Sequence, residues 1–282
     1  MKTSVYIATQ KIHEFPSDAR YRPIFLGGTH EEGFQDDMSG DSISERNSFY
    51  SELTGLYWIW KNDKESEVMG LCHYRRFLWL HKPSWRIRRK SFDSVYACDA
   101  LLQADKIETW LQSYDIILPR PDAFRDESLK EHFIRYTGES AYRLMEEALQ
   151  CVAPECVETF VKVMGRRWGY FANIMIAKRE IFQRYCAWLF PILFQIEKHM
   201  DKNNAANFRL LGYCSERLLN VFVTYHRLHV KELPQLFIVA SKEPLGQSSG
   251  IDMRYLKRRY IPWWVEFTDK LCGRRKNREI NK

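Results

Sequence analysis

Four short segments of the sequence gather side chains that could bind a phosphorylated sugar and move a proton. They are DDMSGDSIS at 36–44, HYRR at 73–76, WGYFAN at 168–173 and SERLLN at 215–220. Arginine presents a planar fork of N–H donors that fits phosphate oxygens, and a carboxylate can accept the proton of an attacking hydroxyl. Aromatic rings and amides suit the C–H faces and hydroxyls of a sugar.

The HYRR segment follows an apolar run, VMGLC at 68–72, which predicts a buried strand. Ligands of α/β proteins bind at the carboxyl ends of strands, so Arg75 and Arg76 could bind an anionic ligand such as a phosphate there. On a continuing strand the two arginines point to opposite faces, and only one reaches the phosphates unless the chain turns there. The structural alternative is a strand end with two solvated arginines.

The acids of the 36–44 loop could hold a divalent cation, ribose hydroxyls or a sugar. The residues alone favour a plainer interpretation, a loop that caps the following helix. Glu52 lies on that helix and fits a packed structural acid as well as a site residue.

Glu216 interrupts an otherwise apolar helical stretch. It is either a general base or one half of a buried ion pair with an arginine. The side chains of adjacent helical residues point in different directions, so we expect no contact between Arg217 and Glu216. An ion-pair partner of Glu216 should then be distant in the sequence. In the WGYFAN segment Phe171 fits the core, whereas Trp168, Tyr170 and Asn173 are better candidates for sugar contacts.

Alternating strand and helix patterns must position these segments. Apolar runs predict strands at 5–8, 24–26, 68–72, 114–119, 171–177 and 236–240. Helical spacing predicts one helix that begins at Ser44 and extends to Trp60, and others at 128–137, 138–149, 179–199 and 212–226. This alternation is typical of a layered α/β domain.

The chain of 282 residues is 45% hydrophobic, enough to bury a sizeable core. Its start lacks the pattern of a signal peptide, and no apolar run approaches the roughly 18 residues of a membrane-spanning helix. Seven scattered cysteines without a CxxC pair argue against a disulfide framework or a structural zinc site. We therefore expect a cytoplasmic protein.

A Gly- and Ser-rich stretch at 241–252 divides a body, residues 1–252, from a C-terminal extension, residues 253–282. The extension has ten Lys and Arg against three acids, which accounts for the whole net charge of +7. The neutral body offers no broad basic face for nucleic acid. The extension also contains Trp263 and Trp264, and this combination favours contact with an anionic membrane surface. The alternative is a docked helix with a solvated end.

Six blocks in this order resemble bacterial capsule and O-antigen biosynthesis proteins that share a domain long catalogued as of unknown function. The blocks are DDMSGDSIS, NSFYSELTGLYWIWKN, GLCHYRR, YDIILP, WGYFANI and SERLLN, within a match that spans 6 to about 238. One difference is Gln10, where the family usually has histidine.

The resemblance implies a glycosyltransferase with an α/β, GT-A-like nucleotide-diphosphosugar transferase fold, in which helices flank a mixed central sheet. Residues 1–252 would be its catalytic domain. Related enzymes carry Asp-x-Asp at the strand end where this chain has HYRR. With the resemblance we expect Glu216 as the general base, and Trp168, Tyr170 and Asn173 at the acceptor. The expected donor-binding residues are Thr9, Lys11, Asp37, Ser39, Gly40, Asp41, Asn47, His73, Tyr74, Arg75 and Arg76.

The expected reaction transfers galactose or galactofuranose from a UDP-sugar to a lipid-linked oligosaccharide, at the inner face of the plasma membrane. We expect no metal ligands and no essential cofactor, although Mn²⁺ or Mg²⁺ could bind the acidic loop. A phosphoryl-transferring enzyme is disfavoured because neither GxxxxGK[ST] nor GxGxxG is present. The rival from another class is a non-catalytic module that binds membrane or nucleic acid through the basic extension.

Overall fold

The computed structural model describes residues 1–80, 89–96, 99, 102–204 and 207–238. The C-terminal extension and its expected membrane contact lie outside these residues. The strands are β1 Thr3–Thr9, β2 Tyr21–Phe25, β3 Gln35–Asp36, β4 Val68–His73, β5 Arg76–Leu78, β6 Arg89–Phe92, β7 Ile116–Pro119, β8 Asp122–Ala123, β9 Trp168–Gly169, β10 Met175–Lys178, β11 Val230–Leu233 and β12 Gln235–Ile238. The helices are α1 Asn47–Tyr50, α2 Leu53–Asn62, α3 Ile107–Leu111, α4 Leu129–Thr137, α5 Glu139–Val152, α6 Val157–Met164, α7 Arg179–His199 and α8 Leu210–Tyr225.

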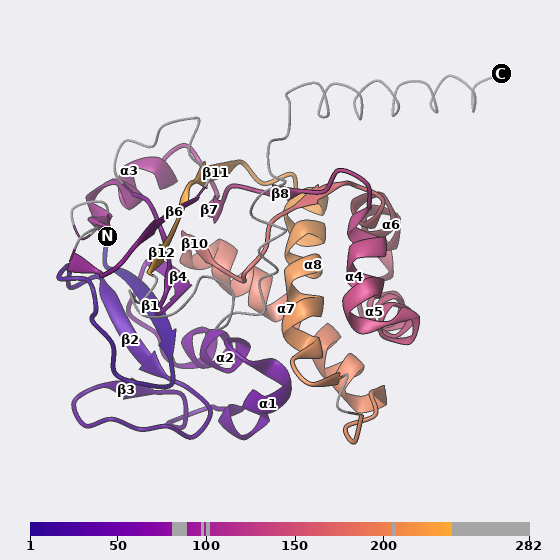
Figure 1. Cartoon of the computed structure of the whole chain (residues 1–282), viewed down its shortest axis with the longest axis horizontal. Helices are drawn as coiled ribbons and strands as arrows, with labels where there is room; N and C mark the ends of the chain where they lie inside the picture. The colour runs from indigo at the N-terminus through magenta and orange to yellow at the C-terminus, as the bar shows by residue number, and fades with distance from the viewer. Residues whose placement is uncertain (81–88, 97–98, 100–101, 205–206, 239–282) are drawn as a thin grey trace.

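A mixed sheet with the order β11-β7-β10-β4-β1-β2-β3 forms the centre of the molecule (Figure 1). Strands β1, β2 and β4 are parallel, and so are β7 and β11, whereas β10 runs antiparallel between β4 and β7. Every residue of β1 is buried. Its side chains alternate, with Tyr6 and Ala8 in one core cluster and Val5 and Ile7 in the other. The sheet is therefore covered on both faces.

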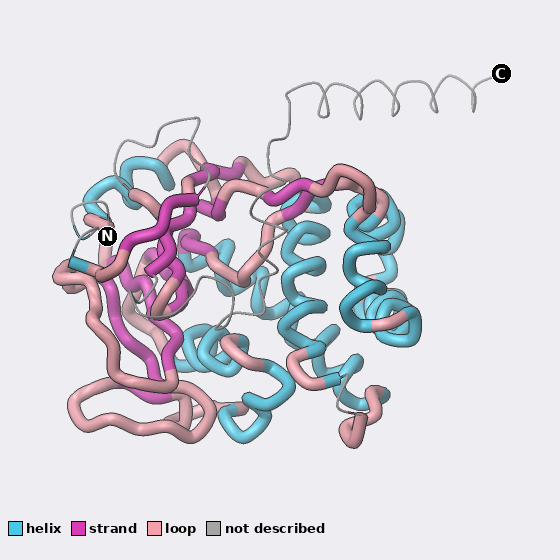
Figure 2. Tube along the Cα trace, in the orientation of Figure 1, coloured by secondary structure: helices cyan, strands magenta, loops and turns pink. Residues whose placement is uncertain are grey.

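Helices cover the two faces unequally. One core cluster joins the sheet to α2, α7 and α8, and extends to α4, α5 and α6. The other joins the opposite face to α3 and to β5 and β12. Figure 1 shows α8 between the sheet and the group of α4, α5 and α6, and Figure 2 shows how the helices gather on this side. Within the described residues no helix combines the length and the apolar character needed to cross a membrane.

The pairing of β4 with β10 depends on a glycine. A Cβ atom at Gly70 would lie 2.9 Å from the carbonyl oxygen of Met175 and 2.8 Å from Cγ1 of Ile176. A side chain at this position would force apart the two strands that lead into the site. Close approach of β4 and β10 therefore aligns the carboxyl end of β4 with the turn that precedes β10.

Two predicted elements are interrupted, and both interruptions occur at left-handed residues. The helix expected to run on from Ser44 breaks at Ser51, whose φ is 52°, between α1 and α2. The strand expected at 171–177 begins only at Met175, because Ala172 and Asn173 have φ values of 74° and 49°. Left-handed backbone cannot continue a helix or a strand, so both predictions were wrong at these points. The helix at 128–137 is confirmed, with a capping box between Ser128 and Glu131.

Candidate functional site

The HYRR segment forms a tight turn between β4 and β5. His73 pairs with Arg76 in an antiparallel bridge, and Tyr74 and Arg75 form the turn between them. Directly opposed residues of two antiparallel strands lie on the same face, so Arg76 accompanies His73. The chain thus turns here, which is one of the two alternatives that the sequence left open, and the turn gives the two arginines different positions. The Arg75 guanidinium lies 5.3 Å from the centre of the Tyr74 ring, and that ring stacks on His13 at 4.2 Å.

Asn173 ties three elements together beside the end of β4. Its Nδ2 donates to Oε1 of Glu52 at 2.7 Å and to the carbonyl of Gly212 at 3.2 Å. The Ser215 hydroxyl donates to Oδ1 of Asn173 at 3.0 Å. Asn173 is buried and immediately precedes the Ile174–Met175 approach to β10. The start of α2, the start of α8 and the turn before β10 thus meet at one amide side chain.

Strained backbone gathers at this meeting point. Ser51, Ala172, Asn173 and Arg209 all have positive φ, between 49° and 74°. The Nε of Arg209 donates to the Ser51 hydroxyl at 3.1 Å, which joins two of the strained turns. Residues other than glycine adopt this conformation at a cost of about 1–3 kcal/mol each, and such strain clusters at functional sites. Four of the five non-glycine residues with positive φ in the described part of the chain lie here, which supports a functional role for this meeting point.

Glu216 enters the same site from α8. Its Oε1 accepts a hydrogen bond from the main-chain N–H of Ala172 at 2.8 Å, and its Oε2 accepts one from Nη1 of Arg217 at 2.7 Å. The expectation of a distant partner was wrong, because the long Arg217 side chain folds back to the carboxylate of its neighbour. Arg217 is itself buried and its Nη2 contacts Nδ1 of His132 at 2.7 Å. The ion pair is present, and the role of general base stays a prediction.

Burial and neighbouring charge set the protonation of the site. Burial raises the pKa of Glu216, and the negative charge of Glu52 raises it further, whereas Arg217 and Arg76 lower it. Burial lowers the pKa of His73 to about 4, with Arg76 acting in the same direction and Glu52 against it. His73 is therefore neutral near pH 7. Among the described residues its Nε2 atom has no hydrogen-bond partner.

The side chains of the acidic loop are engaged in holding the loop itself. Asp37 is fully buried and accepts hydrogen bonds from the Ser44 hydroxyl at 2.5 Å and the Gly27 N–H at 3.2 Å. Burial raises the pKa of Asp37. Asp41 accepts a hydrogen bond from the Tyr57 hydroxyl at 2.9 Å. In the part of the chain that the structure describes, no three His, Cys, Asp or Glu side chains are placed to share a metal ion.

The other residues expected to bind the sugar-nucleotide donor lie within this loop or in the segments that flank it. Trp58 donates to the carbonyl of Ser39 at 2.8 Å, and Gly40 adopts a φ of 65°. At the end of β1 the Thr9 hydroxyl donates to the carbonyl of Lys11 at 2.6 Å. Gln10 Nε2 donates to Oδ1 of Asn47 at 3.1 Å, which links the end of β1 to α1. Contact of these residues with a sugar-nucleotide donor stays a prediction.

The expected acceptor residues separate into two places. Asn173 belongs to the strained cluster, whereas Trp168 and Tyr170 line a pocket of about 690 Å³ between α8 and β11. Residues that the sequence grouped as one acceptor site therefore lie in two neighbouring environments, and their contact with an acceptor stays a prediction. The roles of Arg209 and Arg217 could not be predicted from the sequence. No local pattern indicates the left-handed backbone of Arg209 or the contact of the Arg217 side chain with Glu216.

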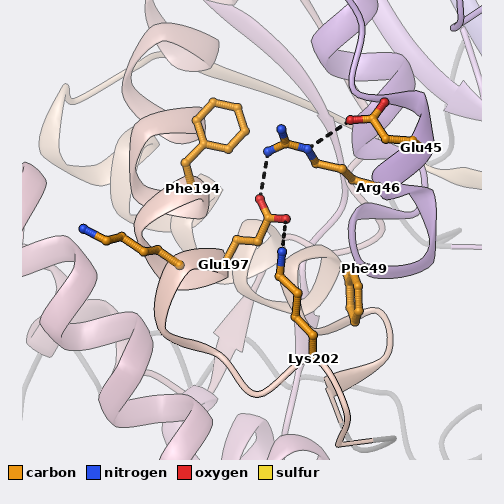
Figure 3. A pocket seen from close by; sticks show the side chains of 7 residues that line it. Glu45, Arg46, Phe49, Phe194, Glu197 and Lys202 are labelled. Atoms are coloured by element: carbon orange, nitrogen blue, oxygen red, sulfur yellow. Dashed lines mark hydrogen bonds and ion pairs between the residues drawn. The ribbon is translucent and has the colours of Figure 1, made fainter.

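A further pocket of about 440 Å³ lies near the C-terminal end of α7 (Figure 3). In Figure 3 the Glu197 carboxylate points between two cations, Arg46 at 3.0 Å and Lys202 at 2.9 Å. Tyr50 also donates to Glu197, at 3.0 Å. These polar groups pair with one another and tie α1 to α7. We therefore place the candidate active site at the end of β4 and not in this pocket.

A family model described as a domain of unknown function, DUF4422, matches residues 4–227. The chain belongs to this family. Comparison with curated protein sequences gives no match.

A solved structure titled as the apo form of WbbM, a bifunctional glycosyltransferase, matches this DUF4422 chain with a TM-score of 0.75 and 27% identity. The match covers 88% of this chain and 48% of the WbbM chain, so the chain spans about half the length of that structure. The fold expected from the sequence, a mixed central sheet flanked by helices as in a glycosyltransferase, is thereby confirmed.

Proposed function

We propose that this DUF4422 domain transfers a hexose, galactose or galactofuranose, from a UDP-sugar to a hydroxyl of a lipid-linked capsule or O-antigen saccharide. The observation that carries the proposal is the meeting of Arg76, Glu52 and Glu216 at the carboxyl end of β4, in a chain similar to a glycosyltransferase. Ligands of α/β sheets bind at strand ends, and this end combines cationic groups with two carboxylates. The WbbM likeness supports glycosyl transfer, and the sugar and acceptor are part of the proposal.

The proposed step breaks the bond between the anomeric carbon and the diphosphate oxygen and forms a bond to the acceptor oxygen. The diphosphate leaves with the bonding electron pair as UDP. Arg76 neutralises its charge, since a guanidinium can bind two phosphate oxygens at once. The acceptor proton passes to the Glu216 carboxylate. Its raised pKa favours proton uptake, and its bond to the N–H of Ala172 fixes its orientation.

His73 and Asn173 position these groups in the proposed mechanism. A neutral His73 adds no charge beside Arg76, so the guanidinium keeps its attraction for phosphate. Asn173 fixes the position of Glu52 through the hydrogen bond to its Oε1. We assign Glu52 to the sugar hydroxyls and not to proton transfer, because Glu216 is the carboxylate whose pKa burial raises.

The proposal is tested by measuring UDP release with a panel of UDP-sugars and a lipid-linked acceptor. Wild-type protein should release UDP only when both substrates are present. Glu216→Gln should fold and bind UDP yet turn over far more slowly. Glu147→Gln is the matched control, because Glu147 is an exposed acid on α5, outside the site. Acceptor-dependent release that survives in Glu216→Gln would remove Glu216 from the mechanism.

A further inference from the structure

The pocket between α8 and β11 has the composition of a ligand site. Its volume of about 690 Å³ falls within the range of roughly 300–1,000 Å³ that is usual for small-molecule sites. Trp168 and Tyr170 form one wall, with their rings edge to face at 6.1 Å between centres. Trp168 is half-buried, so part of its ring remains accessible. The accessible part of the Trp168 ring suits a flat, partly apolar ligand, and the buried Tyr170 ring supports it from the side.

Polar side chains fix the geometry of this wall. The Tyr170 hydroxyl donates to Oε1 of Glu232 at 2.8 Å, so an exposed carboxylate stands at the edge of the rings. Arg166 donates to the Thr224 hydroxyl at 3.0 Å, and its guanidinium lies 5.1 Å from the centre of the Trp168 ring. The rings are thereby supported before any ligand arrives. A preorganised wall loses little conformational entropy on binding.

The pocket lies close to the proposed base along α8. Asn220 lines the pocket and donates to the main-chain carbonyl of Glu216 at 2.7 Å, one helical turn away. Its amide also donates to the carbonyl of Tyr170 at 2.9 Å and accepts from the Tyr170 N–H at 2.7 Å. One turn of helix corresponds to about 5–6 Å, which is on the scale of a single sugar ring. The pocket therefore lies about one helical turn along α8 from Glu216.

We infer that this pocket is a binding subsite for an uncharged saccharide, the part of the acceptor that is already built. The role of the ligand as acceptor rests on the proposed function. The chemical class of the ligand rests on the residues that line the pocket. Sugar C–H faces pack on the Trp168 ring, and hydroxyls donate to Glu232 and accept from Arg166. Glu232 at the edge of the rings repels a phosphate, which favours a neutral ligand although Arg166 and Arg227 also line the pocket.

Saturation-transfer NMR with lactose, maltose and cellobiose tests the inference on the full chain. At least one disaccharide should bind, and Trp168→Ala should weaken that binding by about 10-fold or more, as for the loss of a central aromatic contact. Glu232→Gln preserves the shape of the wall and should weaken binding by at least about 3-fold. Tyr136→Ala, which removes an exposed ring on α4, is the control and should bind like wild type.

UDP binding, followed by thermal shift, separates the two proposals. Trp168→Ala and Glu232→Gln should bind UDP as wild type does. Disaccharide binding without any UDP binding would support the pocket and contradict the proposed function. The inference would be overturned if no disaccharide bound, or if Trp168→Ala and Glu232→Gln both bound it normally. Inorganic phosphate displacing the disaccharide from wild type would also overturn it, by showing an anion site.

Discussion

Replacing Arg76 by lysine should weaken UDP binding much more than the same change at Arg75. The turn at Tyr74 and Arg75 places Arg76 opposite His73, on the face that Glu216 also approaches. The charge of Arg76 acts on the pKa values of both His73 and Glu216, whereas that of Arg75 acts on His13. The two arginines, adjacent in sequence, therefore serve different surroundings.

The size of the effect follows from what lysine preserves. Arg76→Lys keeps the positive charge and loses the planar fork that holds two phosphate oxygens. A lost hydrogen bond to a charged group costs about 1.5–3 kcal/mol, which corresponds to roughly 10- to 150-fold in Kd. Arg75→Lys should stay within about 3-fold of wild type, because the charge of Arg75 acts on His13 and not on His73 or Glu216.

Isothermal titration with UDP, with and without EDTA, measures the difference. Melting temperatures of both variants should be compared first, so that a loss of folding is not mistaken for a loss of binding. A larger loss in Arg75→Lys than in Arg76→Lys would refute the assignment. If both variants bound UDP normally and EDTA abolished activity that Mn²⁺ restored, the diphosphate would instead bind at the acidic loop with a cation.

Further changes test other parts of the account. Glu216→Gln should reduce turnover by about 10²–10⁴-fold with UDP affinity nearly unchanged, and Glu52→Gln should mainly raise the KM for the sugar donor, both read by steady-state UDP release. The lowered pKa of His73 means that the unfolded chain binds a proton below about pH 6.5 while the folded chain does not until about pH 4. Denaturant unfolding should therefore show that the free energy of unfolding decreases as the pH is lowered through this window. The same plot of free energy against pH should be flatter for His73→Gln. Asn173→Asp keeps a residue that tolerates left-handed backbone but loses both donated hydrogen bonds, so the free energy of unfolding should fall by about 1–3 kcal/mol in the same assay. Removal of the residues after Asp252 should release the protein from anionic liposomes in a flotation assay and leave UDP binding in place, since each basic residue contributes about 1 kcal/mol near such a surface.

The repeating parts of the fold could be predicted from the sequence because they follow from periodicity. The apolar run of β4 and the capping box of α4 are local patterns, and both elements form where expected. The breaks at Ser51 and Ala172 could not be predicted, because neither residue type favours left-handed backbone. Their conformation is imposed by packing between segments that are distant in the sequence.

The candidate site was predictable in its members but not in its connections. His73, Asn173 and Glu216 were singled out by type and motif, and their surroundings converge in the structure. The pairing of Glu216 with Arg217 was missed, since helical geometry separates adjacent Cα–Cβ directions but not the ends of long side chains. The division of Trp168 from Asn173 was also missed, because it depends on the turn at Ala172.

Glycosyl transfer itself is tested most directly by mass-spectrometric analysis of a lipid-linked acceptor incubated with the full chain and each UDP-sugar in turn. The account predicts that one UDP-sugar, a galactose or galactofuranose donor, adds a single hexose to the acceptor with one equivalent of UDP released. It also predicts that this product is nearly absent with Glu216→Gln and present with Glu147→Gln. An unmodified acceptor with every UDP-sugar, from a folded protein that does not bind UDP, would contradict the account.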